Sequence, residues 1–189
     1  EVVGTTFIDD CQWDRSAEYV TALGTFTRDV TNGEIYVSAV GTGSFGALKP
    51  KLDRFGDGYI ELDTTVNTGN TVAVVFCWDG VVGASGYYNN GYSVTLRGAS
   101  GSKALEIQKQ VNDETTVLAT ESISFTETKP HRIKVVKSGS TITASVYTID
   151  GTFIKTITST DNTYTEGYCG IFNNGVGSKY HRYQIIAAS

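Results

Sequence analysis

Several residue types and patterns that define whole classes of protein are scarce in this 189-residue chain. It contains no Met, 2 Pro and 3 Cys, and no run of about 18 apolar residues, so we predict no membrane insertion. Cys11, Cys77 and Cys169 allow at most one disulfide bond, which excludes a disulfide scaffold, and we expect buried thiols. Because the sequence begins at Glu1, has no Met and shows no signal-peptide pattern, we expect a processed or recombinant fragment of a multidomain parent protein.

Positive charge is scarce as well. Asp and Glu number 20 against 15 Lys and Arg, which gives a net charge of −5 without any clustered basic run. Nucleic-acid binding depends on clustered Lys and Arg that contact phosphates. We therefore predict that nucleic acid is not a partner of this protein.

The residues that are abundant favour β-strands. Thr, Ser, Val, Ile and Tyr are frequent, and 21 glycines supply turns. Asn32-Gly33 and Asp150-Gly151 each separate two strand-like runs, which is typical of tight hairpins. In residues 59–66, polar side chains that include Glu61 and Asp63 alternate with a core-facing set. About a dozen such short strands and no helical pattern predict an all-β fold, a single antiparallel β-sandwich spanning residues 1–189.

The stretch 71–98 combines a buried strand with a polar, aromatic loop. Its first strand is nearly continuously apolar, as in a central strand buried on both faces, and Trp78 is predicted to share the side of Val74 and Phe76. Aromatic rings stack on the apolar faces of sugars, whereas amide, carboxylate and guanidinium groups bind sugar hydroxyls. The stretch therefore favours sugar binding. Its predicted ligand residues are Trp78, Asp79, Tyr87, Tyr88, Asn89, Asn90 and Arg97.

Several segments together resemble a known superfamily. They are FIDDCQW, NGEIYVSAV, AVVFCWDG, DGTFIKTIT and TEGYCGIFNNG, in that order along the chain. This pattern is similar to the concanavalin A-like lectin/glucanase superfamily, and within it to laminin-G-like and fructan-binding-type carbohydrate-binding modules. The resemblance implies a jelly roll that binds sugar and is secreted or lies on the cell surface. Many relatives have Arg where this chain has Cys77, so no particular sugar is implied.

The resemblance also implies a second group of ligand residues. The strand order of similar folds would bring Asn173, Asn174, Tyr180 and Arg182 together beside the central strands. We predict Asn173, Tyr180 and Arg182 as ligand-binding residues, with a polar hairpin tip as the alternative.

A structural calcium ion is a further expectation from the resemblance. Similar modules often hold calcium through acidic side chains near the paired termini, and Asp9 and Asp10 occupy such a position here. Neighbouring residues on a strand point to opposite faces, so at most one of the two is expected to ligate directly. Asp53 and Asp57 are a weaker alternative.

A catalytic role lacks support in the sequence. Glycosidases use two facing carboxyl groups, and Glu61-Leu62-Asp63 begins the Glu-x-Asp-x-(x)-Glu pattern of some jelly-roll glucanases without its second Glu. We predict a non-catalytic carbohydrate-binding module, from a secreted polysaccharide-degrading enzyme or a surface adhesin, that binds a polysaccharide or oligosaccharide. The alternatives are a glycoside hydrolase or polysaccharide lyase that uses Glu61 or Asp63, and a laminin-G-like protein-binding adhesion domain.

Overall fold

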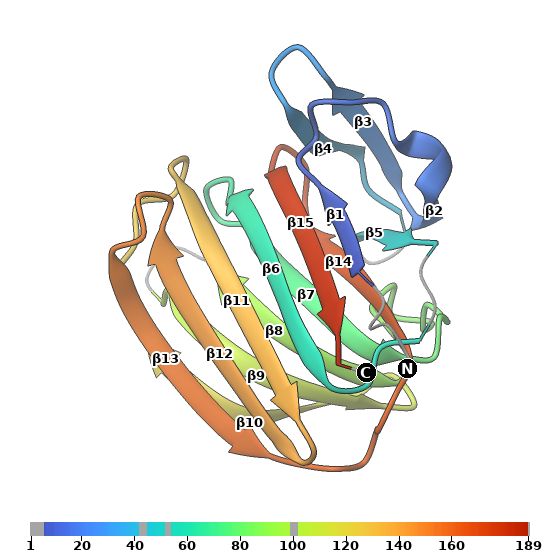
Figure 1. The fold of residues 1–189 in the computed structure, drawn as a ribbon, viewed down its shortest axis with the longest axis vertical. Helices are drawn as coiled ribbons and strands as arrows, with labels where there is room; N and C mark the ends of the chain where they lie inside the picture. Colours follow the sequence, from blue (N-terminus) through green and yellow to red (C-terminus); the bar gives the residue numbers. More distant parts are fainter. Residues whose placement is uncertain (1–5, 42–44, 52–53, 99–101, 189) are drawn as a thin grey trace.

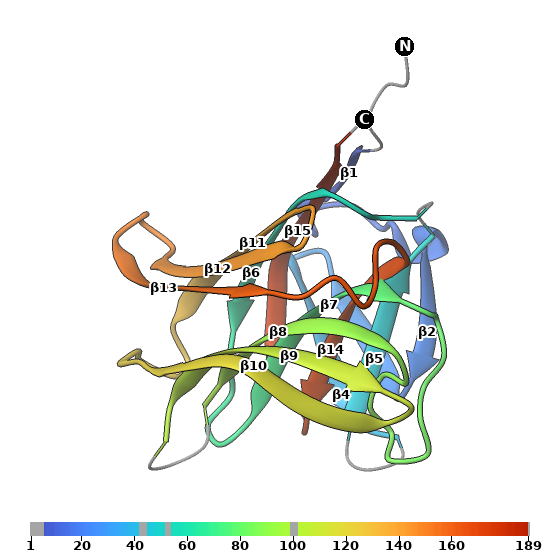
Figure 2. The same ribbon diagram turned by 90° about the horizontal axis from the view of Figure 1, so that it is seen from below.

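The described part of the computed structural model, residues 6–41, 45–51, 54–98 and 102–188, forms two antiparallel β-sheets packed face to face (Figure 1). Figure 2 shows the sheets as two layers. The eight-stranded sheet contains, in spatial order, β13 (Phe153–Thr160), β12 (Thr141–Thr148), β11 (Pro130–Ser138), β6 (Gly58–Thr65), β15 (Lys179–Ala187), β4 (Glu34–Ala39) and β3 (Thr25–Asp29), with β1 (Thr6–Asp9) paired to β15. The seven-stranded sheet contains β10 (Glu114–Ser122), β9 (Ala104–Val111), β8 (Gly91–Arg97), β7 (Thr71–Trp78), β14 (Tyr168–Asn174), β5 (Phe45–Pro50) and β2 (Tyr19–Leu23). A short 3-10 helix, η1 (Ser16–Glu18), precedes β2. The predicted all-β antiparallel sandwich is confirmed.

Tight turns join the hairpins where the sequence predicted them. Gly33 (φ +63°) lies between β3 and β4, and Gly151 (φ +92°) lies between β12 and β13. Glycine adopts these positive φ angles without the steric cost that a Cβ atom would add. The turn residues therefore set the register of these hairpins.

The main hydrophobic core lies between the two sheets. On β6, Ile60 and Leu62 point into this core, whereas Glu61 and Asp63 take part in ion pairs on the outer face. The predicted alternation of this strand is confirmed. β7 is the central strand of its sheet and is buried on both faces, as its apolar sequence indicated.

A second hydrophobic cluster lies on the outer face of the seven-stranded sheet. It contains Ala47, Ala73, Val75, Trp78, Tyr88 and Phe172. These residues come from β5, β7 and β14 and from the connection between β7 and β8, which we call the 79–90 loop. The loop thus folds back over part of the sheet and covers apolar side chains that would otherwise contact water.

The predicted side of Trp78 is wrong. Phe76 and Cys77 both pack in the main core, so alternation along β7 breaks at Cys77, which has φ +50°. The pairing of β14 with β7 shifts register at the same place. An irregularity of one residue exchanges the two faces of a strand. Trp78 therefore joins Val75 on the outer face instead of Val74 in the main core.

The three cysteines are buried and unbonded, as expected. Among the residues described by the structure, no helix is long and apolar enough to span a membrane.

Candidate functional site

A groove of about 380 Å³ lies on the outer face of the seven-stranded sheet. Its residues come from β5, β7, β8, β9, β10 and β14, from the turn between β9 and β10, and from the 79–90 loop. They are Phe45, Thr71, Ser85, Tyr87, Thr95, Arg97, Glu106, Gln108, Gln110, Asp113, Thr115 and Asn174. Polar side chains dominate this set, and two aromatic rings accompany them.

The aromatic residues of the groove are held from below. The Tyr87 ring lies 5.2 Å from the Phe45 ring and 4.5 Å from the Tyr88 ring, measured between centroids. Tyr88 packs in turn against Phe172 of β14 in the second hydrophobic cluster. Tyr87 itself remains partly exposed. The buried cluster thereby fixes the orientation of a ring that still has accessible surface.

The floor of the groove carries polar side chains that hydrogen-bond or ion-pair with one another. The Glu106 carboxylate pairs with Arg97 at 3.0 Å and accepts a hydrogen bond of 2.7 Å from the Gln108 amide. Thr115 donates a 2.6 Å hydrogen bond to Gln110. Glu106 and Gln110 are buried, whereas Arg97, Gln108 and Thr115 retain exposed surface. These side chains therefore present oriented donors and acceptors to the groove.

One end of the groove is bounded by a contact between the tip of the 79–90 loop and the turn between β9 and β10. The Ser85 backbone N–H donates to the Asp113 carboxylate at 2.8 Å, and the Ser85 hydroxyl donates to it as well. These hydrogen bonds lower the pKa of Asp113, because they stabilise its ionised form. Asp113 is thus a carboxylate that anchors the loop.

The two carboxyl groups that line the described groove, Glu106 and Asp113, both have partners within the protein. One Glu106 oxygen pairs with Arg97 and the other accepts a hydrogen bond from Gln108. A glycosidase general acid needs a raised pKa, whereas the pKa of Asp113 is lowered. Glu61 and Asp63 lie on the other sheet, where Asp63 binds Arg132 at 2.6 Å and Glu61 binds Arg182 at 3.1 Å. The described groove is chemically suited to binding polar ligands.

Only Tyr87 and Arg97 of the predicted ligand residues meet in the groove. Trp78 and Tyr88 are fully buried in the second hydrophobic cluster, which leaves no ring face for a sugar to stack on. The other three predicted loop residues lie at the base of the loop. They are Asp79, Asn89 and Asn90, and the amides of Asn89 and Asn90 both donate to Asp79.

The predicted second cluster is divided between the two sheets, so the expectation that it forms one group is wrong. Asn173 and Asn174 belong to β14 of the seven-stranded sheet, and only Asn174 borders the groove. Tyr180 and Arg182 belong to β15 of the eight-stranded sheet. Asn173 and Tyr180 are buried, whereas Arg182 pairs with Glu61 on the outer face.

The predicted calcium ligands do not fit a calcium site. Asp9 is buried and pairs with Arg28 at 2.5 Å, and it also accepts hydrogen bonds from Tyr19 and from the Cys11 N–H. Calcium requires 6 to 8 oxygen ligands, and the Arg28 guanidinium already occupies and neutralises this carboxylate. Asp10 is exposed and accepts a hydrogen bond from the backbone of its own turn. The carboxylate at this position is therefore part of an ion pair.

The remaining carboxylates add no metal site. Asp57 binds Lys137 and the Gly139 N–H, at 3.0 and 2.9 Å, and Asp53 lies outside the described residues. Within residues 6–41, 45–51, 54–98 and 102–188, no group of three or more His, Cys, Asp or Glu side chains could hold a metal ion.

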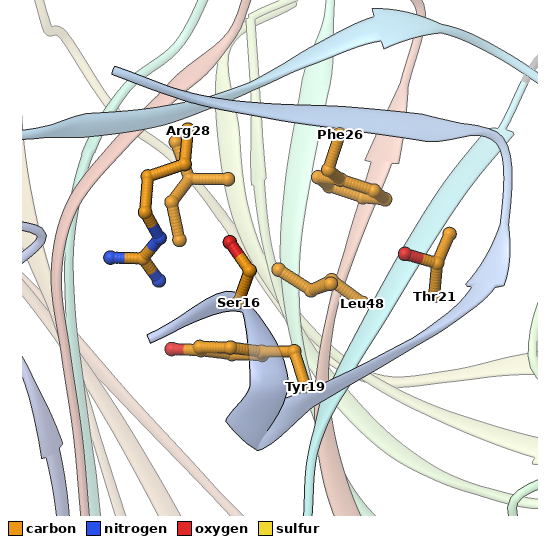
Figure 3. A pocket seen from close by; sticks show the side chains of 7 residues that line it. Ser16, Tyr19, Thr21, Phe26, Arg28 and Leu48 are labelled. Carbon is orange, nitrogen blue, oxygen red and sulfur yellow. The ribbon is translucent and has the colours of Figure 1, made fainter. Parts of the chain in front are cut away.

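A small pocket lies beside the Asp9–Arg28 pair. Figure 3 shows Arg28 at one side of it and the side chains of Tyr19, Phe26 and Leu48 around it. Its volume is about 80 Å³. A cavity of about 150 Å³ holds benzene, so this pocket is too small for a sugar ring.

Several groove residues were not among the predicted ligand residues. The largest omission is β9, where Glu106, Gln108 and Gln110 face the groove from alternate positions. Two neighbouring strands with polar residues at every second position were a usable signal, since β8 contributes Thr95 and Arg97 in the same way. The contributions of Phe45 and Asn174 depend on which strands are neighbours in the sheet, and no local pattern could have indicated them.

The comparisons with known proteins agree with this architecture. No protein-family model matches the chain, and no curated protein matches it. The carbohydrate-binding module CBM66 from Bacillus subtilis is similar over 87% of this chain and 92% of its own, with a TM-score of 0.68 and 17% identity. The exoplasmic/lumenal domain of VIP36 in its Ca2+/Man-bound form is similar over 97% and 89%, with a TM-score of 0.76 and 13% identity. The Bacillus licheniformis β-glucanase is similar over 98% and 99%, with a TM-score of 0.70 and 12% identity.

At these identities the likeness concerns the fold. The protein has the antiparallel jelly-roll sandwich fold that these three proteins share. Proteins with this fold include a carbohydrate-binding module and a glucanase, so the fold leaves open whether this chain binds or cleaves. The assignment to the laminin-G-like or fructan-binding type stays a prediction.

Proposed function

We propose that the groove on the seven-stranded sheet binds a polysaccharide or oligosaccharide without cleaving it. The observation that carries the proposal is the pairing of the partly exposed Tyr87 ring with the accessible polar groups of Arg97 and Gln108 on the groove floor. Tyrosine stacks on the C–H face of a sugar ring, and amide and guanidinium groups bind its hydroxyls. The floor residues are already oriented by hydrogen bonds, which reduces the entropy lost on binding.

We infer from the carboxylates that border the groove that the bound sugar is not cleaved. Glu106 is engaged by Arg97 and Gln108, and Asp113 is held ionised by Ser85. Hydrolysis with two carboxyl groups requires one of them to be protonated as the general acid. Neither of these groups is prepared for that role. The proposal uses no metal ion, and we expect binding to be unchanged by a chelator.

The cellular setting is part of the same proposal. We infer a secreted or cell-surface module that belongs to a larger polysaccharide-degrading enzyme or adhesin. CBM66 is itself described as a carbohydrate-binding module, and the VIP36 domain as exoplasmic or lumenal. A binding module of this kind increases the local concentration of its parent protein on a polymer.

Affinity electrophoresis through gels that contain inulin, mixed-linkage β-glucan, xylan or mannan tests the proposal. We expect at least one polymer to retard the protein, and Tyr87→Ala and Gln108→Ala to weaken this retardation about tenfold, which corresponds to about 1.4 kcal/mol. Thr158→Ala changes an exposed residue of β13, on the other sheet, and serves as the matched control. Retardation that both groove variants retain would contradict the proposed site.

A reducing-sugar assay on the same polymers, with a parallel assay for unsaturated products, tests the absence of cleavage. We expect no product from the wild-type protein. Product formation that disappears in Glu106→Gln or Glu61→Gln would overturn the proposal in favour of a hydrolase or lyase.

A further inference from the structure

A separate pocket of about 200 Å³ lies at the base of the 79–90 loop, away from the tip that borders the groove. Its side-chain lining includes Arg54, Asp79, Asn90, Tyr164, Glu166 and Tyr168. We call it the end pocket. Three of the predicted ligand residues that the groove does not include border this pocket, namely Trp78, Asp79 and Asn90.

The wall of the end pocket is built by a close approach of two backbone segments. Gly167 forms a two-hydrogen-bond bridge with Phe55, of 2.7 and 2.9 Å. A Cβ atom at Gly167 would lie 2.4 Å from the Cys77 carbonyl carbon and 2.6 Å from the Trp78 nitrogen. Only glycine fits at this contact, because the added atom would overlap backbone that cannot move aside. The wall is therefore rigid.

The polar groups of the end pocket are held in place before any ligand arrives. Asp79 accepts hydrogen bonds from the Val81 N–H at 2.9 Å and from the Asn90 amide at 2.8 Å. The Asn90 oxygen accepts a 3.1 Å hydrogen bond from the Tyr164 hydroxyl. Asp79 nevertheless remains exposed. An oriented carboxylate with accessible surface can accept a further hydrogen bond from a ligand hydroxyl.

Three charged side chains line the end pocket, Arg54, Asp79 and Glu166. Arg54 and Glu166 pair at 2.8 Å at its rim, whereas the partners of the Asp79 carboxylate are neutral, including the Val81 N–H and the Asn90 amide. The remaining negative charge of Asp79 disfavours an anionic ligand. Hydroxyl groups both donate and accept, so they match a pocket in which donors and acceptors alternate.

The size of the end pocket restricts the ligand further. A cavity of about 150 Å³ accommodates benzene, and about 200 Å³ therefore suits one ring that carries hydroxyl substituents. The rings of Tyr164 and Tyr168 supply surfaces for its C–H face.

We propose that the end pocket is a second carbohydrate site, which binds one neutral sugar ring. The inference rests on the proposed function in its ligand class, but it uses none of the groove residues. A protein with a groove and an end pocket holds two sugar segments at once, and linkage of the two binding events raises the overall affinity for a polymer.

Titration of the isotope-labelled protein with D-glucose, D-fructose, D-mannose and D-galactose, followed by amide NMR shifts, tests the second site. We expect at least one sugar to produce saturable shifts in residues 79–91 and 164–168. Arg54→Ala and Tyr168→Ala should raise the dissociation constant at least about tenfold. Because the Arg54 side chain is 62% exposed, its removal leaves the fold intact. Gln108→Ala, in the groove, should leave these shifts unchanged.

The outcomes separate the two proposals. If none of the four sugars shifts the end-pocket amides, or if Arg54→Ala and Tyr168→Ala both bind as the wild type does, the second site is wrong. That result leaves the groove untouched, because polymer retardation and its loss in Tyr87→Ala are measured independently. Sugar shifts at the end pocket together with retardation that survives the groove variants would instead overturn the groove and support the end pocket.

Discussion

The Asp9 carboxylate illustrates how strongly the surroundings of a single residue determine its role. From the sequence, Asp9 and its neighbour Asp10 were the predicted ligands of a calcium ion. In the fold it is 0% exposed, and the Arg28 side chain beside it is 7% exposed. Removing one partner of a buried ion pair leaves the other charge without compensation.

We therefore predict that Asp9→Asn lowers the free energy of unfolding by about 3–5 kcal/mol at pH 7, measured by urea denaturation. Burial alone would raise the pKa of Asp9, but hydrogen bonds from Arg28, Cys11 and Tyr19 outweigh it and lower the pKa. Asp9 thus stabilises the folded state above about pH 4, and this stabilisation is lost as the pH falls through the lowered pKa. The difference between Asp9→Asn and wild type should shrink below about pH 4.

Asp10→Asn is the matched control for this prediction. Asp10 is exposed and contacts only its own turn, so its replacement should leave the urea midpoint unchanged. Equal losses in the two variants would contradict the buried ion pair. A midpoint that rises with added calcium in the wild type but not in Asp9→Asn would restore the calcium interpretation.

Among the elements, the 79–90 loop contributes residues to both candidate sites. Its tip presents Tyr87 to the groove, its base carries Asp79 in the end pocket, and its apolar residues cover the second hydrophobic cluster. The tip is held by the two hydrogen bonds from Ser85 to Asp113. We therefore expect loss of these hydrogen bonds to increase the mobility of the loop while the stability of the sheet changes little.

Asp113→Ala should therefore increase hydrogen exchange in residues 83–87, while the thermal midpoint stays close to that of the wild type. Asp150→Ala is a suitable control, since Asp150 accepts similar hydrogen bonds from Thr148 and Thr152 in a hairpin turn far along the chain. Unchanged hydrogen exchange in residues 83–87 of Asp113→Ala would contradict this prediction. It would show that packing against the sheet is sufficient to hold the loop in place.

The strands and hairpins of this protein were largely predictable from the sequence, whereas the irregularity at Cys77 on β7 was not. Alternation on β6 correctly separated core residues from outer ones, because a strand with one buried and one solvated face alternates between apolar and polar residues. β7 is apolar on both faces, so its sequence carried no signal for the irregularity at Cys77 that redirects Trp78. Local sequence distinguishes the faces of a strand only when those faces differ in polarity.

For the molecule as a whole, the sandwich is held together without covalent links among its cysteines. Cys11, Cys77 and Cys169 are all buried, and burial raises the pKa of Cys11 and of Cys77 to about 12. A thiol reacts as its thiolate, so both burial and the raised pKa protect these side chains.

We predict that a disulfide reagent such as DTNB labels no cysteine of the native protein at pH 8, and labels all three after unfolding in urea. A reducing agent should leave the thermal midpoint unchanged. Fast labelling of any cysteine under native conditions, or a midpoint that falls with reducing agent, would contradict the buried thiol state.

The sequence by itself determined the all-β class, the hairpin turns, the faces of the amphipathic strands and the buried state of the cysteines. These properties follow from alternation, turn chemistry and polarity, which act between residues that are neighbours along the chain. Only the tertiary structure decided the sites. The groove joins β9 to Phe45 and Asn174 across the sheet, and the ion pair of Arg28 with Asp9 removed the predicted calcium ligand. Strand order and the packing of a loop on a sheet bring distant residues together, and no local pattern records which strands become neighbours.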